Sequence, residues 1–307
     1  LKDFQGKPLF PPRNVQTISF KLNDEEKGLY NAVTTFVQQY FDKAKERRNI
    51  AFALMILQRR LSSSIRAVRL SLDRRKKRLE EFLRMPELFE ENKEELHKLY
   101  RLREDDIENY SESEIWELEK KLELLTIAEN IDDVKKEIEE INQLIIKARE
   151  AEKKEIESKL YSLKERILSN IAENKLLIFT EFRDTLEYLV DKIKSWDYKV
   201  NFIHGGMNLD SRIEAEKEFK HNAQIMVATE AAGEGINLQF CSFMVNYDIP
   251  WNPNRLEQRM GRIHRYGQQK EVFIYNMVSK DTNEGKILNK LFEKLKKMKE
   301  ALGTDRV

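Results

Sequence analysis

Residues 225–248, IMVATEAAGEGINLQFCSFMVNYD, decide the fold class of this chain. Two apolar runs, Ile225–Thr229 and Met244–Asp248, enclose a turn that contains Gly233 and Gly235. Near-continuous apolar runs are typical of strands that are buried on both faces of a parallel sheet. A small, glycine-containing turn after such a strand lets backbone N–H groups approach a phosphate closely. An ordinary turn between a strand and a helix has the same composition, so the turn alone leaves both interpretations open.

The same pattern continues on both sides of this stretch. Further apolar runs occupy Leu176–Thr180, Val200–His204 and Val272–Met277, which makes five candidate parallel strands. Amphipathic segments suited to crossover helices lie at roughly 184–196, 209–221, 254–266 and 284–299. This alternation predicts an α/β fold with a parallel sheet flanked by helices. In such sheets ligands bind at the carboxyl ends of the strands, which is where the unusual residues of this chain fall.

The upstream part of the chain is predicted to be helical, and we expect three regions. Residues 1–85 would form a proline-containing extended linker and helices that pack on the core, residues 86–170 a charged insertion, and residues 171–307 the α/β lobe. Asn23 or Asp24 is placed to begin the first helix. That helix would carry Tyr30, Val33, Val37 and Phe41, and a second helix would carry Leu61, Ile65, Val68 and Leu72.

The insertion at 86–170 shows two heptad-like apolar seams. One consists of Ile115, Leu118, Leu122 and Leu125, and the other of Ile131, Val134, Ile138, Ile141 and Ile145. A turn at residues 130–132 would separate them, which predicts an antiparallel helical hairpin that projects from the core or packs on it. A structural role is the simpler interpretation, because apolar seams usually face a core.

Composition limits the class of protein without identifying it. Hydrophobic residues make up 40% of the 307 residues and charged residues 36%, yet the net charge is only +1, so any basic surface must be local. We find neither a membrane-spanning stretch nor a signal peptide. The single cysteine, Cys241, excludes a disulfide scaffold and favours a reducing cytoplasm. No metal site is expected.

Residues 258–265, QRMGRIHR, carry the strongest chemical signal. Arg262 and Arg265 are three positions apart and would share one face of a helix that begins near Pro253. Two planar guanidinium groups on one face suit the negative charge that develops in phosphoryl transfer. A solvated arginine-rich helix is the alternative for RxxR alone, but the flanking glutamines and glycines, Gln258, Gly261, Gly267 and Gln268, favour the functional interpretation.

Other strand ends carry weaker signals. His204 precedes two glycines, and Arg212 lies early on the following helix, near a possible phosphate. The segment DIPWNP at 248–253 is rigid and aromatic, and would brace the arginine helix or touch nucleic acid. The sequence contains no GxxxxGK[ST], and therefore no phosphate-binding P-loop.

A basic stretch precedes the charged insertion. It comprises Arg66, Arg69, Arg74, Lys76, Lys77 and Arg78. The stretch would contact phosphates in a sequence-tolerant, salt-dependent way, or it would simply be a solvated helix whose long side chains cover apolar surface.

Together these segments resemble the C-terminal RecA-like lobe of superfamily-two helicases, specifically the Swi/Snf-type ATPases. IFTEF resembles their motif IV, HGGMNLDSR the DNA-contacting segment that follows, VATEAAGEGINLQF motif V, and QRMGRIHRYGQ motif VI. The combination NYDIPWNPNRLEQRMGRIHRYGQ is most similar to the branch that contains the bacterial RNA-polymerase-associated ATPase. FPPR at 10–13 and LQRRLSSS at 57–64 extend the resemblance upstream, whereas residues 86–170 lie outside it.

The resemblance implies a set of roles. Arg262 and Arg265 would be arginine fingers, and Gln258 would contact the γ-phosphate region. Residues near the nucleotide would be Gly235 and Asn237, and residues facing the nucleic-acid backbone would be Thr180, Gly205, Arg212 and Thr229. ATP and Mg²⁺ would be held mainly by a separate N-terminal P-loop lobe of the same protein, so this chain would show no ATPase activity alone. Acidic Glu181 would repel phosphate and is expected to point away or bind a cation.

Three functions remain open on the sequence. The first is the second lobe of an ATP-driven translocase on nucleic acid, with double-stranded DNA as the expected partner, in the cytoplasm or at a nucleoid. The second is half of a strand-separating DNA or RNA helicase, with the hairpin as a wedge. The third is a non-enzymatic scaffold with the hairpin as a docking arm for a protein. The chain does not begin with methionine, which is the pattern expected of a truncated sequence, and no membrane partner is expected.

Overall fold

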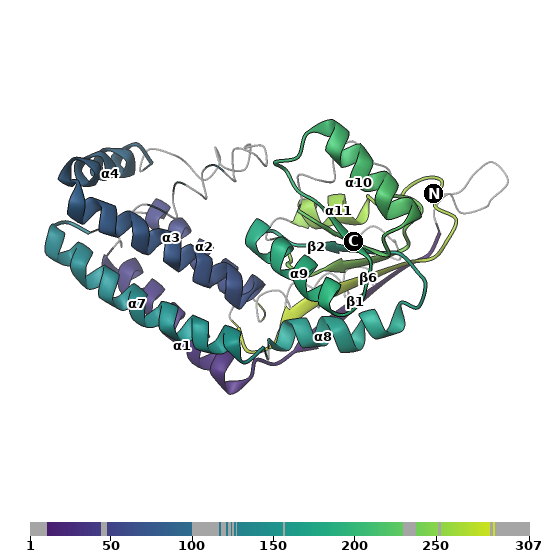
Figure 1. Cartoon of the computed structure of the whole chain (residues 1–307). Coiled ribbons are helices and arrows are strands. Elements are labelled where there is room, and N and C mark those ends of the chain that lie inside the picture. The colour runs from purple at the N-terminus through teal and green to yellow at the C-terminus, as the bar shows by residue number, and fades with distance from the viewer. Residues whose placement is uncertain are drawn as a thin grey trace, which may run out of the picture.

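The computed structural model describes most of the chain and places a parallel sheet beside a group of long helices (Figure 1). The described residues are 11–43, 48–99, 117, 121, 124, 126, 128–155, 157–229, 238–250, 253–282 and 285. Among these residues, no helix combines the length and the apolar character needed to span a membrane.

The sheet has six strands in the order β1-β6-β5-β2-β4-β3, and all neighbours are parallel. The strands are β1 (Arg13–Phe20), β2 (Leu176–Phe179), β3 (Val200–Ile203), β4 (Ile225–Ala228), β5 (Phe243–Asn246) and β6 (Val272–Ser279). The five strands expected from the sequence are confirmed as β2 to β6, with ends that differ by one or two residues. Both β2 and β4 are buried along their whole length, as expected for central parallel strands.

Strand β1 is the sixth strand, and it was not expected. It pairs with β6 over its full length, from Arg13 opposite Val272 to Phe20 opposite Ser279. The expectation of an all-helical N-terminal region therefore fails at this strand. Its partner lies more than 250 residues away in the sequence, and a strand at the edge of a sheet needs only a few apolar side chains, here mainly Ile18 and Phe20.

Helices cover both faces of the sheet. On one face α8 (Ser158–Arg166), the short 3₁₀ helix η1 (Leu168–Asn170) and α9 (Arg183–Ser195) pack against alternate strand residues such as Ile178 and Val245. The other face is covered by α10 (Leu209–His221) and α11 (Pro253–Met260). The predicted crossover helices at 184–196 and 209–221 are confirmed, whereas 284–299 lies outside the described residues apart from Gly285.

The second part of the structure is a helical bundle built from upstream segments. Its helices are α1 (Asp24–Lys43), α2 (Arg48–Ser63), α3 (Ile65–Arg84), α4 (Pro86–Leu99) and α7 (Ile131–Lys153). Asn23 and Glu26 exchange hydrogen bonds of 2.9 and 2.8 Å in a capping box, which confirms the predicted start of α1. Asn130 likewise caps α7, so the helix begins at Ile131, inside the stretch 130–132 where a turn was predicted.

The apolar seam of α7 faces this bundle. Val134, Ile141 and Ile145 are buried in one cluster with residues of α3 such as Val68 and Leu72. This packing agrees with the structural interpretation of the seam. The first predicted seam, at Ile115, Leu118, Leu122 and Leu125, lies outside the described residues, so the hairpin itself stays a prediction.

The predicted second helix is interrupted. Leu61 lies on α2, which ends at Ser63, and Ile65 begins α3. Ser64 adopts an extended backbone, and its hydroxyl accepts the N–H of Ala67, so it is the N-cap of α3. Apolar spacing of four and three continues across the break, which explains why periodicity alone suggested one helix.

The part of the chain just before β2 belongs to the α/β lobe. Leu160 and Leu163 of α8, together with Leu168 of η1, are buried in the core of the sheet. The lobe therefore draws on β1 and on residues 158–170 as well as on the region predicted from 171 onwards. The boundaries at 85 and 170 were predicted from the charged composition. The observed structural units are instead defined by which apolar faces pack against each other.

A buried carboxyl group lies where α8 begins. Burial, assisted by the charge of Glu26, raises the pKa of Glu157 to about 8, although Lys159 and a hydrogen bond with Tyr188 oppose the shift. Between an unfolded pKa of 4.5 and this value, the folded chain keeps a proton that the unfolded chain has lost. Its contribution to stability is therefore full below pH 4.5 and is lost as the pH rises through about 8.

We expect Glu157→Gln to weaken this pH dependence, because a neutral amide carries no proton to lose. The variant should gain stability relative to the unchanged chain as the pH rises from 5.5 to 8. Urea denaturation followed by circular dichroism at these two values measures the difference. Parallel pH dependences of the two proteins would contradict the assignment of a protonated Glu157.

Candidate functional site

The carboxyl edge of the sheet brings together most of the residues singled out in the sequence. Thr180 follows β2, the His204 turn follows β3, and Thr229 follows β4. Asp248 follows β5, and its chain leads into α11 and the arginine-rich segment. Because all strands are parallel, these positions share one edge. Gly235 and Asn237 lie outside the described residues, so their predicted nucleotide contacts stay predictions.

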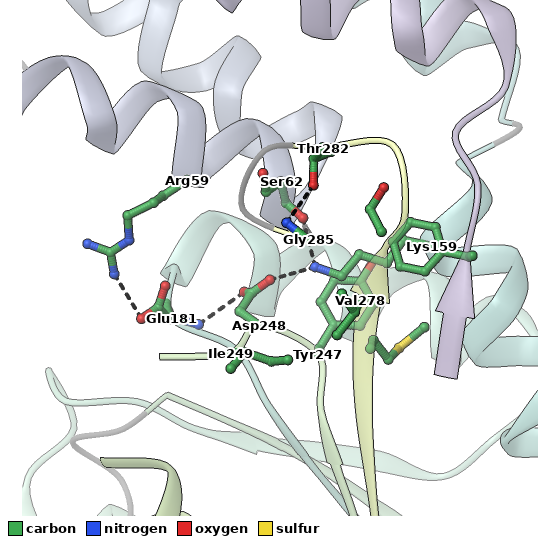
Figure 2. Close-up of a pocket in the computed structure, with 13 residues that line it drawn as sticks. Arg59, Ser62, Lys159, Glu181, Tyr247, Asp248, Ile249, Val278, Thr282 and Gly285 are labelled. Carbon is green, nitrogen blue, oxygen red and sulfur yellow. Dashed lines mark hydrogen bonds and ion pairs between the residues drawn. The ribbon is translucent and has the colours of Figure 1, made fainter. Parts of the chain in front are cut away.

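Asp248 is the centre of a buried polar network at this edge (Figure 2). Its Oδ1 accepts a 2.7 Å hydrogen bond from the ammonium group of Lys159. Its Oδ2 accepts hydrogen bonds from Ser63 Oγ at 2.7 Å, from Thr180 Oγ1 at 2.5 Å and from the backbone N–H of Glu181 at 3.1 Å. Four donors from three separate segments of the chain therefore converge on one carboxylate.

Burial alone would raise the pKa of Asp248, but its partners more than offset that effect. The positive charge of Lys159 and hydrogen bonds from Lys159, Ser63 and Thr180 lower the pKa below its ordinary value. Lys159 also lies 4.2 Å from the ring centre of Tyr247 and donates to the carbonyl of Ser62 at 2.8 Å. The carboxylate is thus held in its charged form inside the protein.

The same network docks the helical bundle on the lobe. The hydroxyl groups of Ser63 and Ser64 lie 2.7 and 2.9 Å from that of Thr185 on α9. Arg60 and Arg74 both bind the carboxylate of Asp184, with nearest distances of 2.8 and 2.7 Å. The junction between α2 and α3 is therefore attached to the lobe by hydroxyl contacts flanked by ion pairs.

Glu181 follows the expectation for an acid at this position. Its carboxylate forms a 2.8 Å ion pair with Arg59, and both side chains are largely buried (Figure 2). The neighbouring Phe182 ring lies 5.8 Å from the guanidinium carbon of Arg59 and 4.8 Å from that of Arg60. A cation from α2 thus neutralises the acid that would otherwise repel a phosphate.

The arginine-rich segment differs from its predicted geometry. Helix α11 ends at Met260, and residues 261–267 form consecutive turns. Arg262 and Arg265 therefore do not share a helical face, and the prediction of a helix over 254–266 is wrong beyond residue 260. Gly261 is the first residue after the helix, and Gly267 has a φ of +96°, a left-handed conformation that favours glycine.

Buried side chains hold these turns in place. Arg259, only 3% exposed, donates a 2.5 Å hydrogen bond to the carbonyl oxygen of Asp248 and lies over the ring of Phe179. Gln268 is also buried, and its amide nitrogen lies 2.8 to 3.0 Å from three carbonyl oxygens, those of Gln239, Cys241 and Ile263. Asp248, the first residue of the segment at 248–253, thus braces α11, which is one of the two roles expected for that segment.

The guanidinium groups of the two predicted arginine fingers, Arg262 and Arg265, are not engaged by other described residues. Within the described part of the chain, no hydrogen bond or ion pair engages the guanidinium group of Arg262 or Arg265. Arg262 is half-buried and Arg265 is exposed, as is Gln258 on α11. Charged donors held on a braced turn without internal partners are available to an external anion.

Two of the residues predicted to contact nucleic acid, Thr180 and Thr229, are buried. Thr180 is fully buried and its hydroxyl is occupied by Asp248, so this side chain does not face solvent as expected. Thr229 is only 9% exposed, and its N–H donates to Ile203. Polar groups at the ends of central strands are drawn into the lobe because they must be satisfied where they are buried.

The loop after β3 stays exposed and is internally braced. Arg212 donates hydrogen bonds of 3.0 Å to the carbonyl oxygens of both Met207 and Gly205, so its guanidinium group shapes this loop. Gly206 donates its N–H to Nδ1 of His204. Desolvation and the charges of Arg183 and Arg212 lower the pKa of His204. The exposed backbone at Gly205 remains the predicted point of phosphate contact.

Most of the basic stretch on α3 is paired within the protein. Arg66 and Arg69 bind Glu152 at 3.0 and 2.5 Å, and Arg74 binds Asp184. Lys76 and Arg78 pair along their own helix with Glu80 and Glu81. Only Lys77 is exposed among the six. A phosphate-binding surface built from all six residues is therefore not what the fold presents, because neighbouring helices supply matching carboxylates.

The residues that organise this site were only partly visible in the sequence. The serines of LQRRLSSS and the aspartate of NYDIPWNP stood within recognised segments, but their contact was not foreseen. Lys159 was missed, since it lies in the charged stretch before the lobe. A lysine on an otherwise apolar helix face, beside Leu160 and Leu163, was the available signal.

The comparisons with known proteins define the class of the lobe. Residues 158–267 match the family described as helicase conserved C-terminal domain, and the chain contains such a domain. Its homologues are Swi/Snf-type chromatin-remodelling ATPases and a Bacillus helicase. A Bacillus subtilis protein, "Uncharacterized ATP-dependent helicase YqhH", is 46% identical over 136 residues, or 43% of this chain and 24% of that protein.

Two further relatives come from eukaryotes. The "ISWI chromatin-remodeling complex ATPase ISW2" of Saccharomyces cerevisiae is 32% identical over 43% of this chain and 12% of its own length. The human "Lymphoid-specific helicase" is 31% identical over 40% of this chain and 15% of its own length. The chain thus matches no more than about a quarter of each of these relatives.

Solved structures agree on the fold. The C-terminal part of the Fun30 ATPase domain aligns with a TM-score of 0.55 at 21% identity, covering 91% of this chain and 88% of that one. The Pyrococcus furiosus Hef helicase domain gives a TM-score of 0.54 at 16% identity, covering 93% and 59%. The lobe therefore has the RecA-like fold of helicase ATPases.

Proposed function

We propose that this chain is the second motor lobe of an ATP-dependent translocase that moves on nucleic acid, with double-stranded DNA as its track. The observation that carries the proposal is the braced turn bearing Arg262 and Arg265, whose guanidinium groups have no internal partner in the described structure. Such groups can stabilise the charge that develops on a transferred phosphoryl group. A lobe retained only as a scaffold has no need of them.

ATP and Mg²⁺ are proposed to bind mainly on a separate P-loop lobe. The sequence contains no GxxxxGK[ST], and phosphoryl transfer needs the P-loop lysine and a metal-binding acid in place. Closure of the two lobes would bring Arg262 and Arg265 to the γ-phosphate, with Gln258 beside them. The names of the relatives, helicases and chromatin-remodelling ATPases, support nucleic acid as the partner.

We therefore expect ATP hydrolysis to require both lobes. The purified chain should hydrolyse no ATP, whereas a two-lobed protein that joins it to its P-loop lobe should show turnover that double-stranded DNA stimulates. A phosphate-release assay with each preparation measures this. DNA-dependent turnover by the chain alone, retained after further purification, would contradict the proposal.

The kind of movement is tested separately. A translocase on duplex DNA should displace a third strand from a triplex without separating the duplex. Strand separation in place of triplex displacement would support the helicase alternative instead. If the protein binds ATP and DNA but shows neither triplex displacement nor strand separation, the scaffold alternative would be favoured.

A further inference from the structure

Asp248 binds two different parts of the protein, one with its side chain and one with its backbone. The side chain accepts from Ser63 at the end of α2, from Thr180 and Glu181 after β2, and from Lys159 on α8. The carbonyl oxygen of the same residue accepts the guanidinium group of Arg259 on α11. One buried residue thus connects the docking site of the helical bundle with the helix that leads to the arginine turn.

We infer that Asp248 is a positioning residue that ties the placement of Arg262 and Arg265 to the docking of the α2–α3 junction on the lobe. This rests on the proposed function. The inference assigns Asp248 no contact with ATP or nucleic acid. It acts through Arg259, whose carbonyl accepts the N–H of Arg262 at 3.0 Å.

The directionality of the contacts supports this role. A buried ion pair is often no more stabilising than apolar residues of similar volume, so stability alone does not require Asp248 and Lys159. Four hydrogen bonds to one carboxylate do fix its orientation, and thereby the direction of the adjoining carbonyl group. That carbonyl is a 2.5 Å acceptor for Arg259, so a rotation at Asp248 is transmitted to α11.

Arg259 is confined on its other sides as well. Its guanidinium carbon lies 5.4 Å from the ring centre of Phe179, and one nitrogen lies 3.5 Å from the side-chain oxygen of Asn246. Asn246 in turn donates to Asn276 on the neighbouring strand at 2.8 Å. The position of Arg259 is therefore fixed by the ends of the strands. The turn that begins two residues later is positioned in the same way.

The chain supplies a matched control. Glu137 on α7 is also fully buried and also binds a cation, since the side chain of Arg75 lies 2.6 Å from its Oε1. Thr126 donates to its other oxygen at 2.5 Å. The contacts of this pair join α3 to α7 and reach Thr126, within the helical bundle. It resembles the Asp248–Lys159 pair in burial and chemistry, but not in position.

The first measurement uses this chain and needs no ATPase activity. In Asp248→Asn, an amide N–H₂ placed toward Glu181 cannot accept its N–H, so the network loosens. Hydrogen exchange followed by mass spectrometry should then be about tenfold faster or more in residues 261–267, the effect expected when one charge-assisted hydrogen bond is lost. Glu137→Gln should leave exchange in this segment unchanged. Unchanged exchange in Asp248→Asn, or equal acceleration in both variants, would overturn the inference and leave the proposed function standing.

The second measurement uses the two-lobed protein. A misplaced arginine turn should lower kcat at saturating nucleic acid about 10- to 100-fold, the range for misplacement of catalytic groups by about 1 Å. KM for ATP should stay nearly unchanged, because ATP is bound mainly elsewhere. Glu137→Gln should keep kcat near normal even if it lowers the melting temperature. A normal kcat in Asp248→Asn would overturn the inference, whereas absence of ATPase activity in the unchanged two-lobed protein would count against the proposed function only.

Discussion

Alanine at Arg262 or at Arg265 is expected to lower DNA-stimulated ATP turnover of the two-lobed protein by about three to five orders of magnitude. The geometry supports this expectation, since neither guanidinium group has a partner among the residues that the structure describes, and their turn is anchored by Arg259 and Gln268. Binding of ATP and of DNA should remain nearly intact, because neither replacement removes a brace of the fold. Steady-state ATPase assays, with nucleotide affinity measured separately, test the prediction.

Two comparisons sharpen this test. Lysine at either position should restore little activity, because a point charge does not reproduce the planar guanidinium fork. Arg149→Ala is the matched control, since Arg149 is 59% exposed and pairs with Asp73 in the helical bundle. It should leave turnover near normal. If both Arg262→Ala and Arg265→Ala keep near-normal turnover, the arginine turn is structural and the proposed site is wrong.

A second large effect is expected on stability. Replacing Lys159 with methionine should lower the free energy of unfolding by about 3–5 kcal/mol, the range for breaking a buried ion pair by removal of one partner. The reason is that Asp248 then keeps a charge in the interior without its cation, while Ser63 and Thr180 still donate to it. Urea denaturation of this chain at pH 7 measures the loss.

The exposed pair of Lys154 with Glu25 provides the control, because these side chains are 52% and 43% exposed. Lys154→Met should change stability by less than about 1 kcal/mol. The double variant Lys159→Met with Asp248→Asn should lose less stability than the sum of the losses of the two single variants, because no unpaired charge remains. A loss for Lys159→Met as small as that for Lys154→Met would contradict the importance of the buried pair.

The pH dependence of the Lys159 variant has a defined sign. The lowered pKa of Asp248 contributes stability that is present above its unfolded pKa and is lost as the pH falls. Without Lys159 the pKa of Asp248 should rise, so part of this stability should already be missing at neutral pH. Denaturation midpoints of the two proteins should therefore converge toward acid pH.

Much of the α/β lobe was predictable from local pattern. Apolar runs at residues 176–180 and 225–229 became central strands, since a strand buried on both faces must be apolar along its length. The capping box at Asn23 was equally local. Strand β1 was not predictable, because it pairs with β6 far away in the sequence, and a chain segment of eight residues with few buried side chains carries little signal of its own.

The candidate site was likewise predictable only in part from the sequence. Spacing and composition pointed to Arg262 and Arg265, but the helix assumed for them ends at Met260, because Gly261 and the contacts of Gln268 favour turns. The basic stretch on α3 suggested a nucleic-acid surface. Whether a charge is displayed or paired depends on what packs beside it, and α7 and α9 supply carboxylates there.

The sequence by itself determined the parallel sheet, the class of the lobe and the pair of arginines, because each depends on residues close together in the chain. Only the tertiary structure decided that Asp248 joins Ser63, which lies 185 residues away, to Arg259 and the arginine turn. The physical reason is that buried polar groups must find partners, and which partners are within reach is settled by how strands and helices pack, not by spacing along the chain.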